Sequence, residues 1–270
     1  MIRDITIGQY IPGNSILHKT DPRVKIIMTL FYMILIFTID SYFGFGFTYM
    51  FTLMTIMLCR IPLKFTLKGI KPILFIVLFT AILNIFTTSG TPIFEYSFIH
   101  ITYEGLDTAA RMALKLILLV VGASLLTLTT TPISLTDGIE SLLKPFSKIG
   151  VPSHEIAMMM SIALRFIPTL LDETDKIMKA QSARGADFDT GNLIQRAKSF
   201  IPVLVPLFVS AFRRADELAT AMEARCYRGG EGRTRMKQLK LGMPDAVSVS
   251  VLILFSALLI YIEKVVLQLQ

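Results

Sequence analysis

Two tripeptides, 41 residues apart, place an arginine between two small residues. They are Ala183-Arg184-Gly185 and Ala224-Arg225-Cys226, and each stands at the end of a long predicted helix. An arginine in the last turn of a helix complements the helix macrodipole, and glycine is common just past a helix end. The small neighbours also leave the guanidinium unshielded, so that it could make paired hydrogen bonds to a carboxylate or a carbonyl of another protein. Each tripeptide is therefore a candidate helix cap or a candidate docking point.

The residues before the two arginines match as well. Asp175 and Asp216 both lie nine positions before the arginine, and Ala180 and Ala221 both lie four positions before it. Capping alone explains one such tripeptide, but a repeat that keeps the aspartate and the alanine in step favours docking onto two similar partners. We interpret Cys226, which stands where the first copy has glycine, as simply another small residue.

The composition predicts a membrane protein. The chain has 270 residues, of which 53% are hydrophobic, and its mean hydropathy is +0.62. These values are too apolar for an ordinary soluble domain. The net charge of +7 is typical of basic cytoplasmic surfaces in a membrane protein and does not indicate nucleic-acid binding. Two cysteines far apart and three scattered histidines predict neither a disulfide framework nor a metal site.

We predict an all-α integral membrane protein with about five transmembrane helices. Four spans lie in a transmembrane region at 1–131, and the fifth lies in 244–270. The predicted spans are about 24–39, 43–58, 73–87, 109–130 and 245–262. The first begins behind a polar stretch with no evident cleavage site, so we expect a retained anchor. The segment 60–71 carries four basic residues and no acid, which predicts a cytoplasmic loop, whereas 88–107 carries only acids and is predicted outside. This topology places the N-terminus and residues 132–243 in the cytoplasm.

Residues 132–243 form an amphipathic block of three predicted helices, two of them long. The first covers about 133–148, the second runs from a predicted N-cap at Ser153 to Arg184, and the third runs from Asn192 to Arg225. Pro168 interrupts the second helix, and Pro202 and Pro206 interrupt the third, so we expect both helices to bend. The charged cluster at 172–176 is predicted to be the solvated face of the second helix.

The missing motifs exclude several functions. The chain has no G-x-x-x-x-G-K-[ST] phosphate loop, H-E-x-x-H or G-x-S-x-G, so we expect neither ATP binding through a P-loop nor a membrane enzyme. A stand-alone secondary transporter is the main alternative, and it would need a polar site near the bilayer midplane. Only Arg111, Lys115 and Asn84 are candidates for that site. We expect Arg111 to pair with Asp107 and Asn84 to serve helix–helix contact.

Several motifs together resemble a known family, the transmembrane T component of energy-coupling factor transporters, which are ATP-driven importers of vitamins and other micronutrients. Residues 21–25, Asp-Pro-Arg-Val-Lys, are similar to the family's N-terminal motif. Residues 165–168, Arg-Phe-Ile-Pro, followed by residues 183–185, are similar to its first coupling-helix signature, and residues 224–226 to its second. The resemblance covers nearly the whole chain.

The resemblance implies a non-catalytic subunit in the plasma membrane that binds no cofactor itself. Two ATPase subunits, which use ATP and Mg, would each receive one arginine-bearing helix end, and the amphipathic helices would support one membrane-embedded S component that binds the substrate. The docking residues would be Ala183, Arg184, Gly185, Ala224, Arg225 and Cys226, with Asp175, Asp216, Pro168 and Pro206 in supporting positions on the coupling helices.

Overall fold

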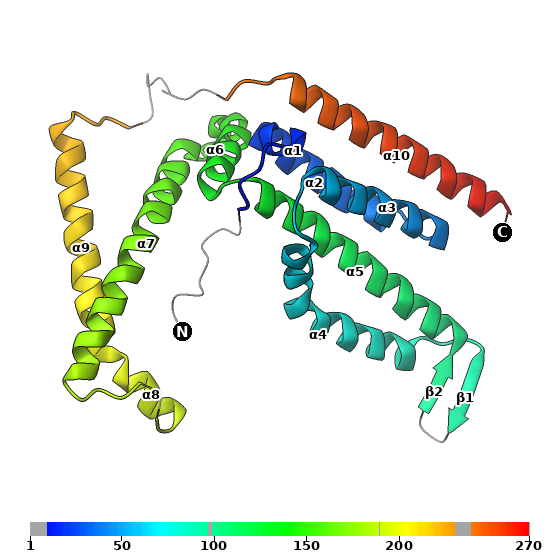
Figure 1. Ribbon diagram of the computed structural model, residues 1–270, viewed down its shortest axis with the longest axis horizontal. Helices are drawn as coiled ribbons and strands as arrows, with labels where there is room; N and C mark the ends of the chain where they lie inside the picture. The colour runs from blue at the N-terminus through cyan, green and yellow to red at the C-terminus, as the bar shows by residue number, and fades with distance from the viewer. Residues whose placement is uncertain (1–9, 97–98, 189, 230–238, 270) are drawn as a thin grey trace. The chain divides into compact units, whose positions relative to one another are not determined.

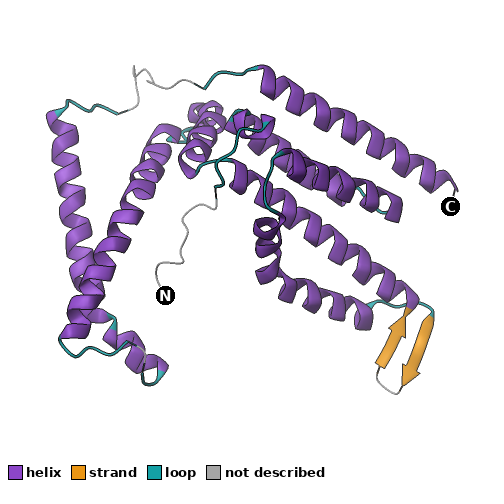
Figure 2. Ribbon diagram, in the orientation of Figure 1, coloured by secondary structure: helices purple, strands orange, loops and turns teal. Residues whose placement is uncertain are grey.

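The computed structural model describes residues 10–96, 99–188, 190–229 and 239–269. Most of the described residues are helical (Figures 1 and 2). The elements are α1 (Ile16–Lys19), α2 (Pro22–Phe37), α3 (Tyr42–Leu58), α4 (Leu63–Thr87), β1 (Pro92–Tyr96), β2 (Ile99–Thr102), α5 (Tyr103–Thr129), α6 (Pro132–Leu143), the 3-10 segment η2 (Lys144–Ile149), α7 (Ser153–Ala183), α8 (Leu193–Ser199), α9 (Ile201–Ala224) and α10 (Met243–Leu269). They fall into a membrane unit, with described residues 10–138 and 239–269, and a central unit, with described residues 139–188 and 190–229.

The prediction of an all-α membrane protein is confirmed, with one two-stranded hairpin added. By length and composition, five described helical segments could cross a membrane: α4, α5, α7, residues 194–224 of α8 and α9, and most of α10. The number agrees with the prediction, but the set differs. The helices α2 and α3 have 16 and 17 residues, fewer than the ~20 that span the hydrocarbon layer without tilt or thinning. The helices α7 and α8–α9 qualify although they are amphipathic.

The membrane unit has a core where α2, α3, α5 and α10 meet. Ile36, Phe45, Leu118 and Leu259 are buried there. Phe51 on α3 stacks against Phe255 on α10 with ring centroids 3.9 Å apart. The helix α4 packs against α5 and leaves a largely apolar outer surface exposed, as expected for a helix that faces lipid.

The start of α2 has the predicted cap. The Asp21 carboxylate accepts a hydrogen bond from the Arg23 backbone N–H at 2.9 Å, and Pro22 occupies the first helical position. Asp245, at the start of α10, accepts the backbone N–H groups of Asp21 and Gly242, both at 2.6 Å. One buried carboxylate therefore joins the beginnings of the first and last long helices of the membrane unit.

The predicted basic loop at 60–71 is wrong in its secondary structure. The helix α4 begins at Leu63, so Lys64, Lys68 and Lys71 lie on its first turns and are exposed. Lysine has a high helix propensity, and it therefore extends an apolar helix instead of ending it. The basic character of this end of α4, on which the topology prediction rests, is unchanged.

The hairpin between α4 and α5 was not predicted. The strands β1 and β2 pair antiparallel, with Glu95 opposite His100 and Tyr96 opposite Ile99, and the register is irregular between Pro92 and Phe94. The acidic composition of this segment indicated only a loop.

The two basic residues of α5 are paired. Arg111 bonds Asp107 one turn earlier at 2.7 Å, which confirms the predicted pair. Tyr42 donates to the same carboxylate, and its ring lies 5.4 Å from the Arg111 guanidinium carbon. Lys115 reaches Asp40, before the start of α3, at 3.2 Å. These contacts fasten the first half of α5 to the segment that joins α2 and α3, and they reduce the cost of placing charge on an apolar helix.

The helices between Pro132 and Ala224 begin and end close to the predicted positions, with three corrections. The stretch predicted as one helix at 133–148 is α6 followed by η2, which ends at Gly150 with φ 93°. Ser153 is not an N-cap; it is the first residue of α7, and Pro152 occupies the cap position without a side-chain hydrogen bond.

The third predicted helix is broken at Phe200. Its first part, α8, starts with the predicted Asn192 in a capping box with Gln195. Pro202 then falls in the first turn of α9, where a missing N–H costs nothing. Pro168 and Pro206 instead lie inside α7 and α9.

Candidate functional site

The first arginine end closes in a Schellman arrangement. Arg184 is the C-cap of α7, and Gly185 follows with φ 91°. The Gly185 N–H donates to the Ser182 carbonyl, and the Ala186 N–H donates to the Gln181 carbonyl, both at 3.0 Å. These are the two bonds that define the motif, and they satisfy carbonyls that the helix leaves unpaired.

The second arginine end repeats the same bonds. Arg225 is the C-cap of α9, and Cys226 follows with φ 53°. The Cys226 N–H donates to the Glu223 carbonyl at 2.8 Å, and the Tyr227 N–H donates to the Met222 carbonyl at 3.0 Å. The match seen in the sequence is therefore also a match of backbone geometry, with each arginine presented at the same point of the same turn.

A small side chain is not the only requirement at position 226. A left-handed backbone costs a residue with a Cβ about 1–2 kcal/mol, whereas glycine adopts it freely. Gly185 uses that freedom, and a Cβ at this position would meet no atom within 4 Å. What the position requires is positive φ, so the interpretation of Cys226 as simply a small residue is incomplete.

Both arginines are solvent-exposed. Among the described residues, neither Arg184 nor Arg225 has an ion pair or a side-chain hydrogen bond. The four flanking residues Ala183, Gly185, Ala224 and Cys226 are exposed as well. Each helix C-terminus thus carries one accessible guanidinium with small neighbours, which suits capping and also leaves all the guanidinium donors available to a partner.

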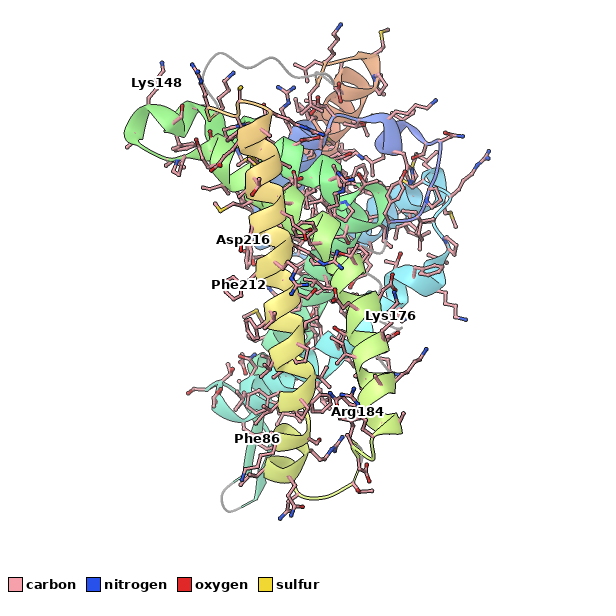
Figure 3. The ribbon with its side chains drawn as sticks, turned by 90° about the vertical axis from the view of Figure 1, so that its left-hand side faces the viewer. Phe86, Lys148, Lys176, Arg184, Phe212 and Asp216 are labelled. Atoms are coloured by element: carbon pink, nitrogen blue, oxygen red, sulfur yellow. The ribbon has the colours of Figure 1, made fainter. Side chains whose placement is uncertain are left out.

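The helices α7 and α9 form an antiparallel pair. Ser210 on α9 donates to one oxygen of Glu173 on α7 at 2.6 Å, and Arg214 donates to the other oxygen at 2.9 Å. Nearer to the first arginine end, the Gln181 side-chain amide donates to the Pro202 carbonyl at 3.3 Å. Because the chain directions are opposed, Arg184 and Arg225 lie toward opposite ends of the pair. Figure 3 shows Arg184 at the foot of α7 and Asp216 higher on α9, toward its C-terminal end.

The Pro202 carbonyl can accept this hydrogen bond because the residue four positions later in α9 is a proline. Pro206 has no N–H, so it cannot bond the carbonyl four residues earlier, which is that of Pro202. The Gln181 amide of α7 supplies the missing donor. Pro206, predicted to support the site by bending its helix, thus also frees an acceptor for a contact between helices.

The two predicted supporting aspartates differ in their exposure to solvent. Asp216 is exposed, and Asp175 is half-buried. Glu173 makes the contacts with Ser210 and Arg214 described above, so the prediction that the 172–176 cluster is a solvated face is wrong for this residue. Ser210 and Arg214, four residues apart and so on one helix face, could have indicated the partner of a carboxylate on α7.

Comparison with known proteins places the chain. The cobalt transport protein family, CbiQ, matches residues 13–236. The chain is 64% identical to the energy-coupling factor transporter transmembrane protein EcfT of Ruminiclostridium cellulolyticum, over 98% of this chain and 99% of that protein. The chain belongs to the family of energy-coupling factor transporter transmembrane proteins. The T-component prediction is confirmed.

Other members of the family resemble the chain along nearly its whole length. The EcfT protein of Clostridium kluyveri is 63% identical over 92% of this chain and 93% of its own length. That of Bacillus subtilis is 47% identical over 97% of this chain and 100% of its own length. The range matched by the family, 13–236, includes both arginine ends and all the described residues of the central unit. The chain is a multi-pass membrane protein and the membrane component of an energy-coupling factor transporter.

Proposed function

We propose that this chain is the membrane scaffold of an energy-coupling factor importer, and that it transmits the motion of two ATPase subunits to a substrate-binding S component. The observation that carries the proposal is the pair of equivalent helix ends. Each has an exposed arginine as C-cap of the same Schellman turn, and the two lie toward opposite ends of one antiparallel helix pair. One end for each of two similar ATPases accounts for both the repetition and the separation.

The helix pair is suited to carry a force. The Glu173 and Gln181 contacts tie α7 to α9 at two levels. When the ATPases approach each other on binding ATP, a push at either arginine end moves both helices together, and the S component resting on them is reoriented. The substrate, a vitamin or another micronutrient, is selected by the S component and not by this chain.

The topology in this proposal has five spans, α2 to α5 and α10, with the N-terminus and the coupling helices in the cytoplasm. The exposed lysines on the first turns of α4 support it, since cytoplasmic segments are enriched in basic residues. Under this assignment the chain is non-catalytic, binds no cofactor itself, and depends on partner subunits for ATP and Mg.

The alternative, a stand-alone secondary transporter, would lack a free polar site, because the three candidate residues are already engaged. Arg111 and Lys115 are paired with Asp107 and Asp40, and the Asn84 amide donates to the Thr80 carbonyl of its own helix at 2.9 Å. Groups engaged in this way are poorly placed to bind an ion or a solute in the middle of the membrane.

The test is the double variant Arg184→Ala with Arg225→Ala, co-expressed with ATPase and S subunits. We expect the purified membrane complex to lose its ATPases and ATP-driven uptake to stop, while the chain still inserts. The control is Arg213→Ala, which removes an exposed arginine on α9 that lies outside both ends. Normal assembly and uptake in the double variant would contradict the proposal.

A further inference from the structure

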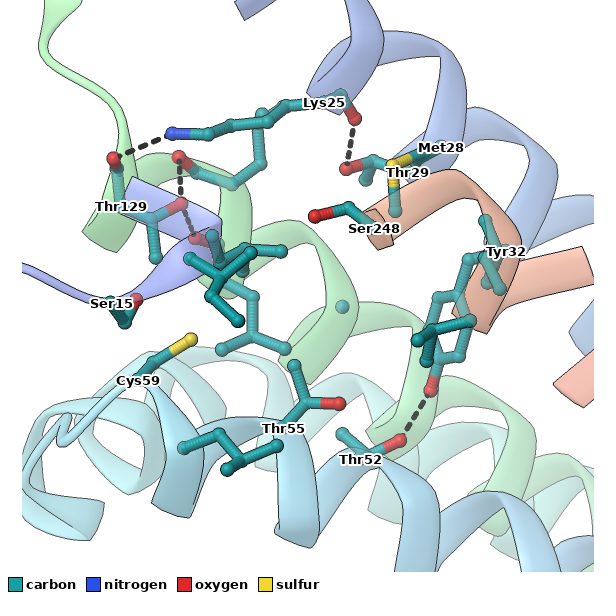
Figure 4. A pocket seen from close by; sticks show the side chains of 18 of the residues that line it. Ser15, Lys25, Met28, Thr29, Tyr32, Thr52, Thr55, Cys59, Thr129 and Ser248 are labelled. Carbon is teal, nitrogen blue, oxygen red and sulfur yellow. Dashed lines mark hydrogen bonds between the residues drawn. The ribbon is translucent and has the colours of Figure 1, made fainter. Parts of the chain in front are cut away.

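A cavity of about 230 Å³ lies within the membrane unit (Figure 4). It is bordered by α1, by the first half of α2 and the last half of α3, and by the end of α5 and the start of α10. For comparison, an engineered apolar cavity of about 150 Å³ is large enough to bind benzene. The space can therefore hold part of a hydrocarbon chain.

The polar side chains that line the cavity are already hydrogen-bonded. Thr29 and Thr55 donate to carbonyls of their own helices, at 2.8 and 2.9 Å. The Tyr32 and Thr52 hydroxyls bond each other at 2.7 Å, and the other lining hydroxyls, those of Ser15, Thr129 and Ser248, also have partners. A polar solute or a buried water needs two to four free partners. These walls offer few, so they favour an apolar occupant.

Three of the apolar residues that line the cavity are themselves exposed. Ile16, Leu58 and Val251 line it and are 56%, 66% and 49% exposed. In a protein embedded in a bilayer, exposed apolar side chains on spanning helices contact lipid. An acyl chain from the surrounding bilayer is thus the hydrocarbon within reach of the cavity.

One positively charged side chain borders this space without an ion pair. The buried Lys25 side chain lines the cavity, and its ammonium donates to three uncharged oxygens: the carbonyls of Thr129 and His18 at 2.9 and 3.4 Å, and the Thr130 hydroxyl at 3.2 Å. Among the described residues, no carboxylate lies within ion-pair distance of it. The nearby Asp245 carboxylate is occupied by two backbone N–H groups.

The position along the helices also suits an anionic head group. The cavity lies at the start of α2 and α10 and at the end of α3 and α5, which the proposed topology places in the cytoplasmic leaflet. Anionic lipids create the negative potential of that surface, and basic pockets between helices bind their head groups. Arg60, exposed just beyond α3, adds a second basic residue at this end.

We propose that the cavity binds one acyl chain of an anionic phospholipid, with the lipid phosphate at the end of the cavity where Lys25 and Arg60 lie. The lipid would fill the space between four spanning helices and hold their cytoplasmic ends at a fixed spacing. This site is separate from the two arginine ends, and it rests on the proposed topology for the choice of leaflet and for α2 and α3 as spanning helices.

The experiment measures lipid binding to the delipidated full chain by native mass spectrometry, with dioleoyl phosphatidylglycerol and dioleoyl phosphatidylcholine as probes. We expect one phosphatidylglycerol per chain, bound at least about fivefold more tightly than phosphatidylcholine, the factor for one basic residue near an anionic surface. In Lys25→Met that preference should disappear.

A matched pair of variants tests the cavity itself. Thr55→Phe fills it, whereas Thr80→Phe makes the same change on α4, at a threonine with the same hydrogen bond to its own helix but outside the cavity. Thr55→Phe should weaken phosphatidylglycerol binding by at least about tenfold, because the displaced methylenes return to water or detergent, and Thr80→Phe should not. If Thr55→Phe fails to fold, Val251→Trp blocks the cavity from an exposed position.

Three results would overturn the proposal: equal binding of the two lipids, equal binding by Thr55→Phe and Thr80→Phe, or displacement of the lipid by inorganic phosphate alone. Loss of the bound lipid when the chain assembles with its partner subunits would show that a partner segment fills the cavity, and it would overturn the proposal too.

Discussion

The two arginine ends share a backbone turn but differ in what surrounds it. At the Arg184 end, a glycine takes the left-handed position without strain, and the Gln181 contact to α9 lies within one turn. At the Arg225 end, a cysteine takes that position, and the nearest contact to α7 described above is at Arg214, three turns back. The first end is braced by the neighbouring helix, and the second projects beyond its last brace. Equivalent motifs can therefore respond differently to the same force.

The largest expected effect comes from reversing one charge at a time. Arg184→Glu and Arg225→Glu should each reduce the number of ATPase subunits retained by the purified complex from two to one, because in the proposed assembly each end serves its own subunit. Loss of a buried charge partner weakens an interface by about 2–5 kcal/mol. Native mass spectrometry counts the subunits, and Arg213→Glu is the control. If either single change released both ATPases, the two ends would not be independent, and the comparison between them would fail.

The next effect concerns the Glu173 contact between α7 and α9, which we call the brace. Glu173→Ala removes the acceptor for Ser210 and Arg214. We expect a loss of about 0.5–1 kcal/mol in the stability of the central unit, since the pair is partly exposed. ATP hydrolysis by the assembled complex should continue while uptake per ATP falls.

The matched control for the brace is Asp172→Ala, which removes an exposed carboxylate one residue earlier. Chemical unfolding and a paired assay of hydrolysis and uptake provide the two readouts. An unchanged ratio of uptake to hydrolysis in Glu173→Ala would argue that the helix pair does not carry the motion.

The most local effect is confined to the two turns and should leave assembly and uptake unchanged. Cys226→Gly should stabilise the end of α9 by about 1 kcal/mol, and Gly185→Ala should destabilise the end of α7 by a similar amount, because only glycine is unstrained at positive φ. Hydrogen exchange of the amides in the last turn of each helix measures both. Changes of the same sign in the two variants would contradict the structural equivalence of the positions.

Local chemistry predicted the helix ends well, because capping depends on neighbours in sequence. The cap at Asp21, the start at Asn192 and the ends at Arg184 and Arg225 all follow from short-range hydrogen bonds. The start of α4 was missed because a run of lysines identifies a cytoplasmic surface without saying whether its backbone is helical.

The other wrong predictions concern features that depend on more than the neighbouring residues in sequence. The break at Phe200 was hidden by an apolar stripe that continues through it, although Pro202 is well suited to begin a helix. At the site, the sequence located both arginines but not the Glu173 contact, because a charge on an amphipathic helix faces solvent unless another helix covers it. The strained turn at Cys226 could not be predicted, since few residues with a Cβ adopt positive φ.

The contacts between α7 and α9 divide α9 like a lever about its fulcrum. Beyond Gln181, α7 continues for only three residues to Arg184, roughly 5 Å, whereas α9 continues for eleven residues from Arg214 to Arg225, roughly 16 Å at 1.5 Å per residue. The helix length beyond the last of these contacts is therefore between three and four times as long at the Arg225 end as at the Arg184 end. In the proposed complex, two ATPases that move symmetrically would then act on helix ends of unequal free length, and the longer one is the end that a cysteine closes.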